Sequence, residues 1–423
     1  AVAQVRAAAA SSGRHIALLG DLQGPKIRTG ALVVPGILQR GRQVSLTAVA
    51  GADGEGVIPI SHPELVEALV VRDRVLLADG QIELRVRSCE RDRVECVVVR
   101  GGKLNPRQGV SVPGRPMRLP ALTGKDMADM AFCAELGMDY LAISFVRSAA
   151  DVIACRAAVE ALNWKVPVIA KLEQKEVLAH LDSVFAAADA VMVARGDLGV
   201  ELPLGQVPAV QKDLIERANR VGVPVITATE MLESMVQGNR PTRAEASDVA
   251  NAIWDGTDAV MLSQETSVGA HPIEAVQAMA QICRAAEAHP AYQRARLPWE
   301  NRGEVGSAIA HAAASVAREL RAAVIIAFTE SGMTALRVSK AHPDVPVLAA
   351  SPHPEVLRRT ALYSGVVPLA AEAGHDTDDM VDKATAGARA AGLVRSGQRV
   401  VVVAGIPIGQ PGQTNLLRVL TVR

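Results

Sequence analysis

Aromatic residues are scarce in this sequence, at 2% of 423 residues. So few rings argue against a stacking platform for single-stranded nucleic acid. The cores have to be built from aliphatic side chains, which suits parallel strands covered by helices. Charge of one sign is not in excess either, because 45 Lys and Arg balance 45 Asp and Glu. The chain therefore has no global field for DNA or an anionic membrane, and any charged ligand must be bound by a local arrangement.

Cysteine pairs and long apolar runs are also missing. The five cysteines form no C-x-x-C pair, so we interpret them as small buried side chains in a reducing compartment rather than a disulfide or zinc framework. No stretch approaches the roughly 18 to 20 apolar residues of a membrane helix, and the chain does not open with a signal-peptide pattern. These features predict a cytoplasmic α/β protein of about three domains.

A short aliphatic run that ends on polar residues, followed by an Ala-rich stretch, recurs along the chain. Six such runs lie at residues 15–21, 140–147, 166–173, 190–197, 223–230 and 258–265. Runs of this kind are typical of a parallel sheet that is buried on both faces. In a (β/α)8 barrel all strands point one way, so their polar ends meet at one mouth. A closed barrel needs eight strands, and we therefore expect the first two to be absent from this chain.

Two other regions differ from the barrel pattern. Residues 27–117 are short alternating segments broken by Gly, Pro and Asp, which predicts a small antiparallel β-barrel domain inserted at the barrel mouth as a lid. After a linker at 290–304, aliphatic runs alternate with helices again, which predicts an open-sheet α/β domain. The predicted domains are the TIM-type barrel at 1–26 and 118–290, the lid at 27–117, and the C-terminal domain at 305–423.

Lys171 and Glu173 are two residues apart on a predicted strand, so both side chains point to the same face. The next run ends on Asp197. Two carboxylates at a barrel mouth can hold a hard cation such as Mg²⁺ and leave positions for substrate oxygens and water. An ammonium nearby would neutralise charge on a transferring phosphoryl group. A structural salt bridge at the barrel rim is the competing interpretation.

Hydroxyl and carboxylate side chains end the last two predicted barrel strands, as Thr229, Ser263 and Glu265. A hydroxyl beside a carboxylate can relay a proton to a carbon centre. Ser and Thr at strand ends more often cap the following helix, and this alternative stays open. Thr242 and Glu245 fit a capping box, and we expect them to have that role alone.

Two further segments are candidate phosphate contacts. Gly24 and Pro25 indicate a hinge at the joint with the inserted domain, beside Lys26 and Arg28. In the C-terminal domain, a turn of small and hydroxyl residues between a strand and a helix could bind an anion, although many such turns need these residues anyway. Its candidates are Thr329, Ser331, Gly332 and Thr334, with the loop at 405–415 as the other wall.

These segments together resemble the pyruvate kinase family over essentially the whole chain. The motifs, in order, are GDLQGPKIRTG (20–30), LTGKDMADMAF (122–132), ISFVRS (143–148), IAKLEQKE (169–176), MVARGDLGVE (192–201), ITATEMLESM (226–235), PTRAEASDVANAIWDGTDAVMLSQET (241–266) and TESGMTALRVS (329–339). The resemblance is closer to the second bacterial form than to the animal enzymes. It implies a barrel, an inserted β-domain lid and a C-terminal α/β regulatory domain.

Carried over residue by residue, the resemblance implies phosphoryl transfer from phosphoenolpyruvate to ADP, which gives pyruvate and ATP. The implied roles are catalysis by Lys171 and Thr229, proton relay by Ser263 and Glu265, Mg²⁺ (or Mn²⁺) binding by Glu173 and Asp197, substrate binding by Arg195, Gly196, Asp197 and Thr229, and nucleotide binding by Arg28. A small phosphorylated effector is implied at Thr329, Ser331, Gly332 and Thr334. The implied assembly is a cytoplasmic homotetramer with no nucleic-acid or membrane partner.

The sequence departs from the family pattern at several positions. The first two barrel strands and their R-x-N-x-S segment are absent, and Gln108 stands where the family has a Lys that reaches ATP. Glu230 replaces the Gln of the T-A-T-Q-M motif. Leu22 follows Asp21 where potassium-dependent members have Thr, and Lys26 stands where they have Glu. We therefore hypothesise that the Lys26 ammonium substitutes for K⁺, so that K⁺ is not required.

Two other functions fit parts of the sequence. A truncated homologue that binds ligands without catalysis would explain the missing strands, but the retained Lys171, Glu173 and Asp197 oppose it. A barrel open at two strands would also expose unpaired strand edges. A Mg²⁺-dependent barrel lyase that acts on phosphoenolpyruvate or pyruvate would share the metal site without needing the C-terminal domain. We expect the kinase, with the two strands encoded upstream of Ala1.

Overall fold

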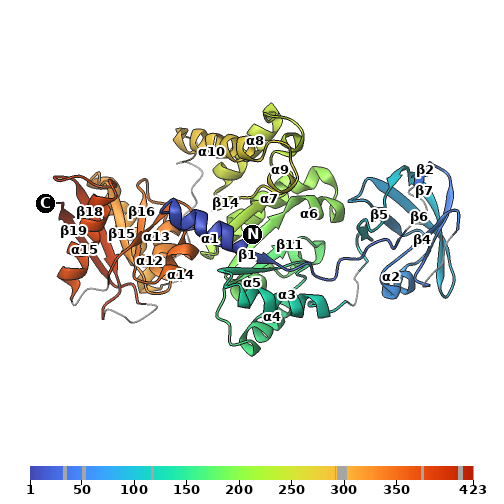
Figure 1. Cartoon of the computed structure of the whole chain (residues 1–423), viewed down its shortest axis with the longest axis horizontal. Helices are drawn as coiled ribbons and strands as arrows, with labels where there is room; N and C mark the ends of the chain where they lie inside the picture. Colours follow the sequence, from blue (N-terminus) through green and yellow to red (C-terminus); the bar gives the residue numbers. More distant parts are fainter. Residues whose placement is uncertain are drawn as a thin grey trace.

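The computed structural model describes residues 1–31, 36–49, 54–115, 119–290, 292, 303–372, 376–407 and 413–422. They form three bodies in a row, with a parallel sheet and its helices in the middle, a β-domain on one side and an α/β domain on the other (Figure 1). Among these residues we find no helix with the length and hydrophobicity that a bilayer crossing requires. The predicted linker and the boundary at 117 and 118 lie largely outside the described residues.

The central sheet contains the six strands that the aliphatic runs predict, all parallel and in the order β1-β10-β11-β12-β13-β14. They are β1 (Leu19–Asp21), β10 (Tyr140–Ile143), β11 (Val168–Leu172), β12 (Ala190–Ala194), β13 (Val225–Ala228) and β14 (Ala259–Val260). Every residue of β10, β12 and β13 is buried, as expected for strands covered on both faces. In the part of the chain that the structure describes, β1 and β14 are the edges of this curled, barrel-type sheet.

The helices of this body precede or follow its strands. The first of them lies before β1 and has no buried residue, and the others pack around the sheet. In chain order the helices are α1 (Val2–Ser11), α3 (Gly124–Glu135), α4 (Ala149–Ala161), α5 (Leu181–Ala187), α6 (Arg195–Glu201), α7 (Val207–Arg220), α8 (Arg243–Asp255), α9 (Gln264–Ser267) and α10 (Pro272–Ala288), with short 3₁₀ turns η1 (Lys175–Ala179), η2 (Leu204–Gln206) and η3 (Glu233–Val236). The predicted capping box of Thr242 and Glu245 starts α8. Glu245 does more than cap, because it also accepts hydrogen bonds from the Ser234 amide (2.7 Å) and hydroxyl (2.5 Å).

The inserted region is a β-domain, but its strands are not all antiparallel as predicted. One sheet has the order β4-β3-β7-β6-β5-β9, and β2 pairs with β8. The elements are β2 (Gly36–Leu38), β3 (Gln43–Thr47), β4 (Val57–Pro59), α2 (Pro63–Ala68), β5 (Arg74–Leu77), β6 (Ile82–Cys89), β7 (Arg93–Arg100), β8 (Gly102–Leu104) and β9 (Val110–Ser111). β3 and β4 run parallel. Alternation shows which side chains face inward, and it carries no information on the direction of the neighbouring strand.

The C-terminal domain is an open sheet in the order β17-β16-β15-β18-β19, with helices around it. Its elements are α12 (Val305–Glu319), β15 (Val324–Phe328), α13 (Met333–Lys340), β16 (Val347–Ser351), α14 (Pro354–Thr360), β17 (Val366–Ala370), α15 (Thr377–Ala390), β18 (Arg399–Ala404) and β19 (Leu416–Thr421). The four predicted strands are parallel. β19 was not predicted: it is an antiparallel edge strand whose apolar residues are interrupted by Arg418 and are exposed or half-buried.

The five cysteines are free, as predicted. Cys96 and Cys155 are buried, and burial raises the pKa of each thiol to about 12. The expectation of burial is wrong for Cys89, which is exposed where the last residues of β6 reach solvent. Two thiols are therefore inert core groups, one is exposed, and those of Cys133 and Cys283 are half-buried.

A buried ion pair joins the C-terminal domain to the central sheet. Lys340, the last residue of α13, is 1% exposed, and its ammonium lies 2.6 Å from the Asp258 carboxylate and 2.7 Å from the Asn219 side-chain oxygen. The same Asp258 oxygen accepts the amide N–H of Val225 at the start of β13 (2.8 Å). Burial lowers the pKa of Lys340, and the Asp258 charge opposes that shift. The two charges compensate each other inside the protein.

We expect Lys340→Met to lower the free energy of unfolding by about 3–5 kcal/mol, because it leaves the Asp258 carboxylate buried without a cation. The Lys340→Met/Asp258→Asn double variant should recover part of the loss, since no unpaired charge remains. Urea denaturation measures both, with Lys125→Met on the exposed face of α3 as the control. A single variant as stable as the parent would contradict this account of the interface.

Candidate functional site

The carboxyl ends of neighbouring parallel strands bring polar side chains to one edge of the central sheet. Asp21 ends β1, Ser144 follows β10, and Lys171 is the penultimate residue of β11. Asp197 lies in the first turn of α6, directly after β12, and Thr229 follows β13. Residues that are far apart in the sequence therefore meet, as the predicted parallel arrangement requires.

Lys171 lies at the centre of this edge. Its ammonium is 3.0 Å from the Glu173 carboxylate, 3.2 Å from Asp21 and 3.0 Å from the Ser144 hydroxyl. Burial by itself lowers the pKa of Lys171, but the carboxylates of Glu173 and Asp21 outweigh it, so the pKa lies above its ordinary value. The ammonium keeps its charge. Ser144 is not among the residues predicted from the sequence, although a hydroxyl directly after a buried strand was the available signal.

Glu173 and Asp197 are the two carboxylates that could hold a metal ion. Glu173 is 1% exposed and accepts the amide N–H of Phe145 (2.9 Å). Burial raises its pKa, Lys171 opposes this, and Asp197 raises it further. The repulsion between the two carboxylates would be relieved by a cation between them. No group of three or more acidic, His or Cys side chains is arranged as a metal cage in the described residues, so oxygens from outside the chain would complete the coordination.

The Thr229 hydroxyl faces the start of α6 and does not cap the helix that follows β13. It accepts the amide N–H of Gly196 (2.7 Å) in the first turn of α6 and donates to the Ala228 carbonyl (2.7 Å). The buried Arg195 guanidinium donates to the backbone carbonyls of Thr229 (2.8 Å) and Glu230 (3.2 Å) and pairs with Asp248 (2.5 Å). Arg195 therefore holds the turn after β13 in place.

Left-handed backbone occurs at this edge in residues other than glycine. The φ angles are 57° at Phe145, 67° at Thr229 and 52° at Glu230. Such conformations cost of order 1–3 kcal/mol each and cluster where the surroundings fix a functional geometry. At Phe145 the strained backbone directs its N–H to Glu173. At Thr229 and Glu230 it is held by the two hydrogen bonds from Arg195.

Ser263 and Glu265 lie together after β14. The buried Glu265 carboxylate accepts the amide N–H of Ser263 (2.7 Å) and that of Leu232 (3.0 Å). Ser263 is the N-cap residue of α9 but makes no side-chain capping bond. The carboxylate therefore ties two strand-end loops together and leaves the Ser263 hydroxyl uncommitted to the helix.

Gly24 and Pro25, for which we predicted a hinge, lie at the joint between the inserted β-domain and the barrel. Gly24 has φ of 67°, and a Cβ atom there would lie 2.9 Å from the Phe145 ring, so only glycine fits. The Arg28 guanidinium donates to the Arg107 carbonyl (3.0 Å). The backbone N–H of Gln108 donates to the Thr29 hydroxyl (3.0 Å). The predicted phosphate contact Arg28 thus also braces the lid.

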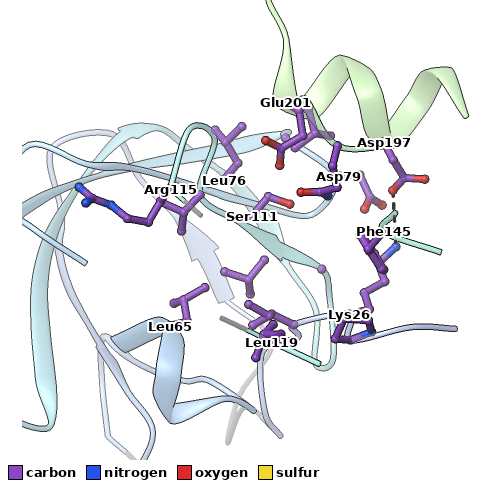
Figure 2. Close-up of a pocket in the computed structure, with 18 of the residues that line it drawn as sticks. Lys26, Leu65, Leu76, Asp79, Ser111, Arg115, Leu119, Phe145, Asp197 and Glu201 are labelled. Carbon is purple, nitrogen blue, oxygen red and sulfur yellow. Dashed lines mark ion pairs between the residues drawn. The ribbon is translucent and has the colours of Figure 1, made fainter. Parts of the chain in front are cut away.

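A cavity of about 90 Å³ lies between the lid and the central sheet. Figure 2 shows the ion pair of Lys26 and Asp197 (3.9 Å) at one end, and apolar side chains, among them Leu65 and Leu119, in the part toward the lid. The Glu201 carboxylate points into it from α6. Burial, and then the charge of Glu176, raises the pKa of Glu201 to about 7.

The predicted anion-binding turn of the C-terminal domain, residues 329–334, is held by hydrogen bonds of its own threonine side chains. The Thr329 hydroxyl accepts the Gly332 amide N–H (2.8 Å), and Gly332 has φ of 93° at the start of α13. The Thr334 hydroxyl lies 3.0 Å from that of Thr414. The loop at 405–415 thus approaches the turn as predicted, although its residues 408–412 lie outside the described part. The exposed Ser331 is at the tip of the turn.

Comparison with known families gives two matches that together span most of the chain. Residues 1–276 match the pyruvate kinase barrel domain, and residues 307–420 match the pyruvate kinase alpha/beta domain. The second match argues against the barrel lyase, which would not need a C-terminal domain. The combination of both domains favours the kinase over the ligand-binding homologue as well.

Individual relatives agree with this result. The chain is 43% identical to the pyruvate kinase of Geobacillus stearothermophilus, over 99% of this chain and 72% of that protein. It is 42% identical to that of Mycobacterium tuberculosis, over 98% of this chain and 88% of that protein. A crystal structure of a pyruvate kinase from Cryptosporidium parvum matches with a TM-score of 0.90 and 33% identity, over 99% of this chain and 87% of the other. The chain belongs to the pyruvate kinase family, phosphotransferases that use a divalent metal to convert phosphoenolpyruvate and ADP to pyruvate and ATP.

Proposed function

We propose that phosphoryl transfer from phosphoenolpyruvate to ADP takes place at the strand-end edge around Lys171. The observation that carries this proposal is the position of the Lys171 ammonium, within 3.2 Å of the Asp21 and Glu173 carboxylates. An ammonium held there stabilises the negative charge that develops on the transferring phosphoryl group and on the enolate oxygen. It needs no reorganisation, because the carboxylates already fix it.

Glu173 and Asp197 would hold the divalent metal, which we propose to be Mg²⁺, with Mn²⁺ as a substitute. Mg²⁺ is usually bound by one or two carboxylates and completes its shell with water and substrate oxygens. The mutual repulsion of the two carboxylates fits that role. Bound there, Mg²⁺ would neutralise phosphate charge. Phe145 and Lys171 contribute by keeping the Glu173 carboxylate in one orientation.

The backbone of Gly196 and Asp197 and the Thr229 hydroxyl would bind phosphoenolpyruvate. The Gly196 N–H donates to the Thr229 hydroxyl (2.7 Å), which donates to the Ala228 carbonyl (2.7 Å). A substrate oxygen bound here would replace these two hydrogen bonds with its own. We propose that Arg195 acts as a positioning residue instead of a direct contact, because its guanidinium is committed to Thr229, Glu230 and Asp248.

Ser263 and Glu265 would belong to the relay that protonates the enolate. Glu265 is fixed by two amide N–H groups, and the Ser263 hydroxyl is free to rotate toward a water molecule. Such a chain can deliver a proton to a carbon centre without a flexible acid. The keto form that results makes transfer to ADP favourable.

The inserted β-domain, 27–117, would act as the lid over this edge. Arg28 would contact the nucleotide phosphates from the joint, and the cavity in Figure 2 separates the lid from α6. The Gly114 backbone in the lid lies near the Glu201 carboxylate of α6 and acts to lower its pKa, against the larger effect of burial. Closure around such contacts excludes water from the transferring phosphoryl group.

The C-terminal domain, 305–423, would bind a small phosphorylated effector at Thr329, Ser331, Gly332 and Thr334. The supporting observation is the ordered turn at the start of α13, with the Thr414 hydroxyl opposite it. A sugar phosphate or AMP that shifts the phosphoenolpyruvate saturation curve would identify it. We further propose a cytoplasmic homotetramer, which light scattering can test.

The proposed role of Lys171 predicts that Lys171→Met lowers kcat by about 100- to 1000-fold, because a preorganised charge at the transition state is lost. ATP formation from phosphoenolpyruvate and ADP in a coupled assay measures it. Lys165→Met, an exposed lysine before β11, is the matched control and should leave kcat unchanged.

The same assay tests the metal. EDTA should abolish ATP formation by the parent chain, and added Mg²⁺ should restore it.

For the Lys171 prediction, a Lys171→Met variant that keeps the parental kcat with an unchanged circular dichroism spectrum would refute the proposed centre.

From the position of the Lys26 ammonium we expect that ATP formation does not depend on K⁺. Its ammonium lies 3.9 Å from Asp197, where it can supply the monovalent charge. The rate in tetramethylammonium chloride should therefore equal the rate in KCl at equal ionic strength. Lys26→Gln should become stimulated by K⁺, whereas strict K⁺ dependence of the parent would overturn the hypothesis.

From the raised pKa of Glu201 we expect the free energy of unfolding to depend on pH. Its pKa is raised from 4.5 to about 7 by folding, so the folded chain holds a proton that the unfolded chain releases. Stability from this group is present below about pH 4.5 and is lost as the pH rises to about 7. We expect Glu201→Gln, which cannot ionise, to be more stable than the parent at pH 8.

This stability gain should shrink as the pH falls to 5, when the parent carries the proton as well. Thermal melting at several pH values measures the difference between the two chains. The exposed Glu160→Gln is the control and should track the parent throughout. A gain for Glu201→Gln that does not change with pH would show that the ionisation of Glu201 is not responsible.

A further inference from the structure

Glu230 borders the proposed substrate site and has no part in the mechanism above. It follows Thr229 after β13, and it is exposed. Its carboxylate oxygen Oε1 lies 3.8 Å from the point that a Cβ atom on Gly196 would occupy. The Thr229 hydroxyl is 3.4 Å from the same point. The carboxylate and the hydroxyl therefore both lie over Gly196, where phosphoenolpyruvate would bind.

The backbone of Glu230 is fixed relative to Gly196. Its φ angle of 52° lies in the left-handed region, which residues other than glycine rarely adopt. The Arg195 guanidinium donates hydrogen bonds to the backbone carbonyls of Thr229 and Glu230 and so holds this conformation. Arg195 is in turn held by Asp248 (2.5 Å) and precedes Gly196 directly in α6. Only the side-chain torsions of Glu230 are free, so its carboxylate stays close to the substrate site.

The acidic side chains nearby add to the negative charge of Glu230, and the Arg195 guanidinium against its backbone is already paired with Asp248. The pKa of Glu233 is raised by burial and then by the charges of Glu265, Glu230 and Glu245, so the loop after β13 is a region of negative potential. The two ammonium groups of the site face other carboxylates: Lys171 pairs with Asp21 and Glu173, and Lys26 with Asp197. An anion at Gly196 therefore meets a negative charge from the β13 side.

We propose that Glu230 is a specificity-determining residue that weakens the binding of phosphoenolpyruvate by like-charge repulsion; this inference rests on the proposed function. Phosphoenolpyruvate carries a carboxylate and a phosphate, whereas pyruvate carries a carboxylate alone. The repulsion therefore opposes the substrate more than the product. For charges about 6 Å apart and an effective dielectric constant between about 20 and 80, it corresponds to a factor of roughly 3 to 100 in affinity.

Glu230→Gln keeps the shape of the side chain and removes its charge. We expect it to lower the KM for phosphoenolpyruvate roughly 3- to 30-fold, to change kcat less than about twofold, and to leave the KM for ADP unchanged. The difference from the parent should shrink in about 0.5 M salt, which screens exposed charges. Glu230→Asp keeps the charge on a shorter side chain and should resemble the parent more closely than Glu230→Gln does. Glu160→Gln in α4, which removes an exposed charge away from this loop, is the control and should not alter the KM for phosphoenolpyruvate.

Binding measurements separate this inference from the proposed function. The probe is 2-phosphoglycolate with Mg²⁺, which has both anionic groups of the substrate but no enol to transfer. Calorimetry should show tighter binding to Glu230→Gln than to the parent. If the parent binds the probe but forms no ATP, the proposed function fails, and the affinity ratio still decides the role of Glu230.

Three results would overturn the inference. Equal affinity in both chains would show that the Glu230 charge does not reach the substrate. Weaker binding to Glu230→Gln, with a higher Mg²⁺ requirement, would show that the carboxylate helps to hold the metal or the substrate. Binding to neither chain would show that Gly196 and Thr229 form no anion site, which would remove both proposals.

Discussion

The site depends on the burial of the parallel strands on both faces. A charge in the middle of such a strand would lose its hydration without a partner, which costs several kcal/mol. Ionic groups can therefore occur only where the strands end, and parallel strands all end at the same edge. Asp21, Lys171 and Asp197 are at or next to such ends. The aliphatic composition of the chain and its concentrated charge are two results of this one constraint.

At that edge, each charge depends on its neighbours. Lys171 remains an ammonium although it is buried, because Glu173 and Asp21 stabilise its charge more than burial disfavours it. Glu173 in turn is destabilised by burial and by Asp197, and Lys171 only partly compensates. The group is short of positive charge, which suits a divalent cation and an anionic substrate that arrive together. A net charge of zero over the chain is compatible with strong local fields of this kind.

The sequence allowed the six parallel strands, the C-terminal sheet and the shared face of Lys171 and Glu173 to be predicted, because each follows from a local pattern. It did not reveal that Ser144 reaches Lys171, or that Arg195 turns inward to the carbonyls after β13. Those contacts depend on the distance between different strand ends, and no local pattern encodes that distance. The parallel pair β3 and β4 was missed for the same reason.

The turn after β13 illustrates how one arrangement has two consequences. The hydrogen bonds from Arg195 stabilise a left-handed Thr229, which places the hydroxyl on the Gly196 amide. The left-handed backbone at Thr229 and Glu230 also places the Glu230 side chain over Gly196. The geometry that builds the proposed anion site therefore requires Glu230, the residue after Thr229, to border it. The backbone fixes the position of that residue, and only its charge can vary without disturbing the turn, so the residue at 230 is where the affinity for an anionic substrate can be adjusted.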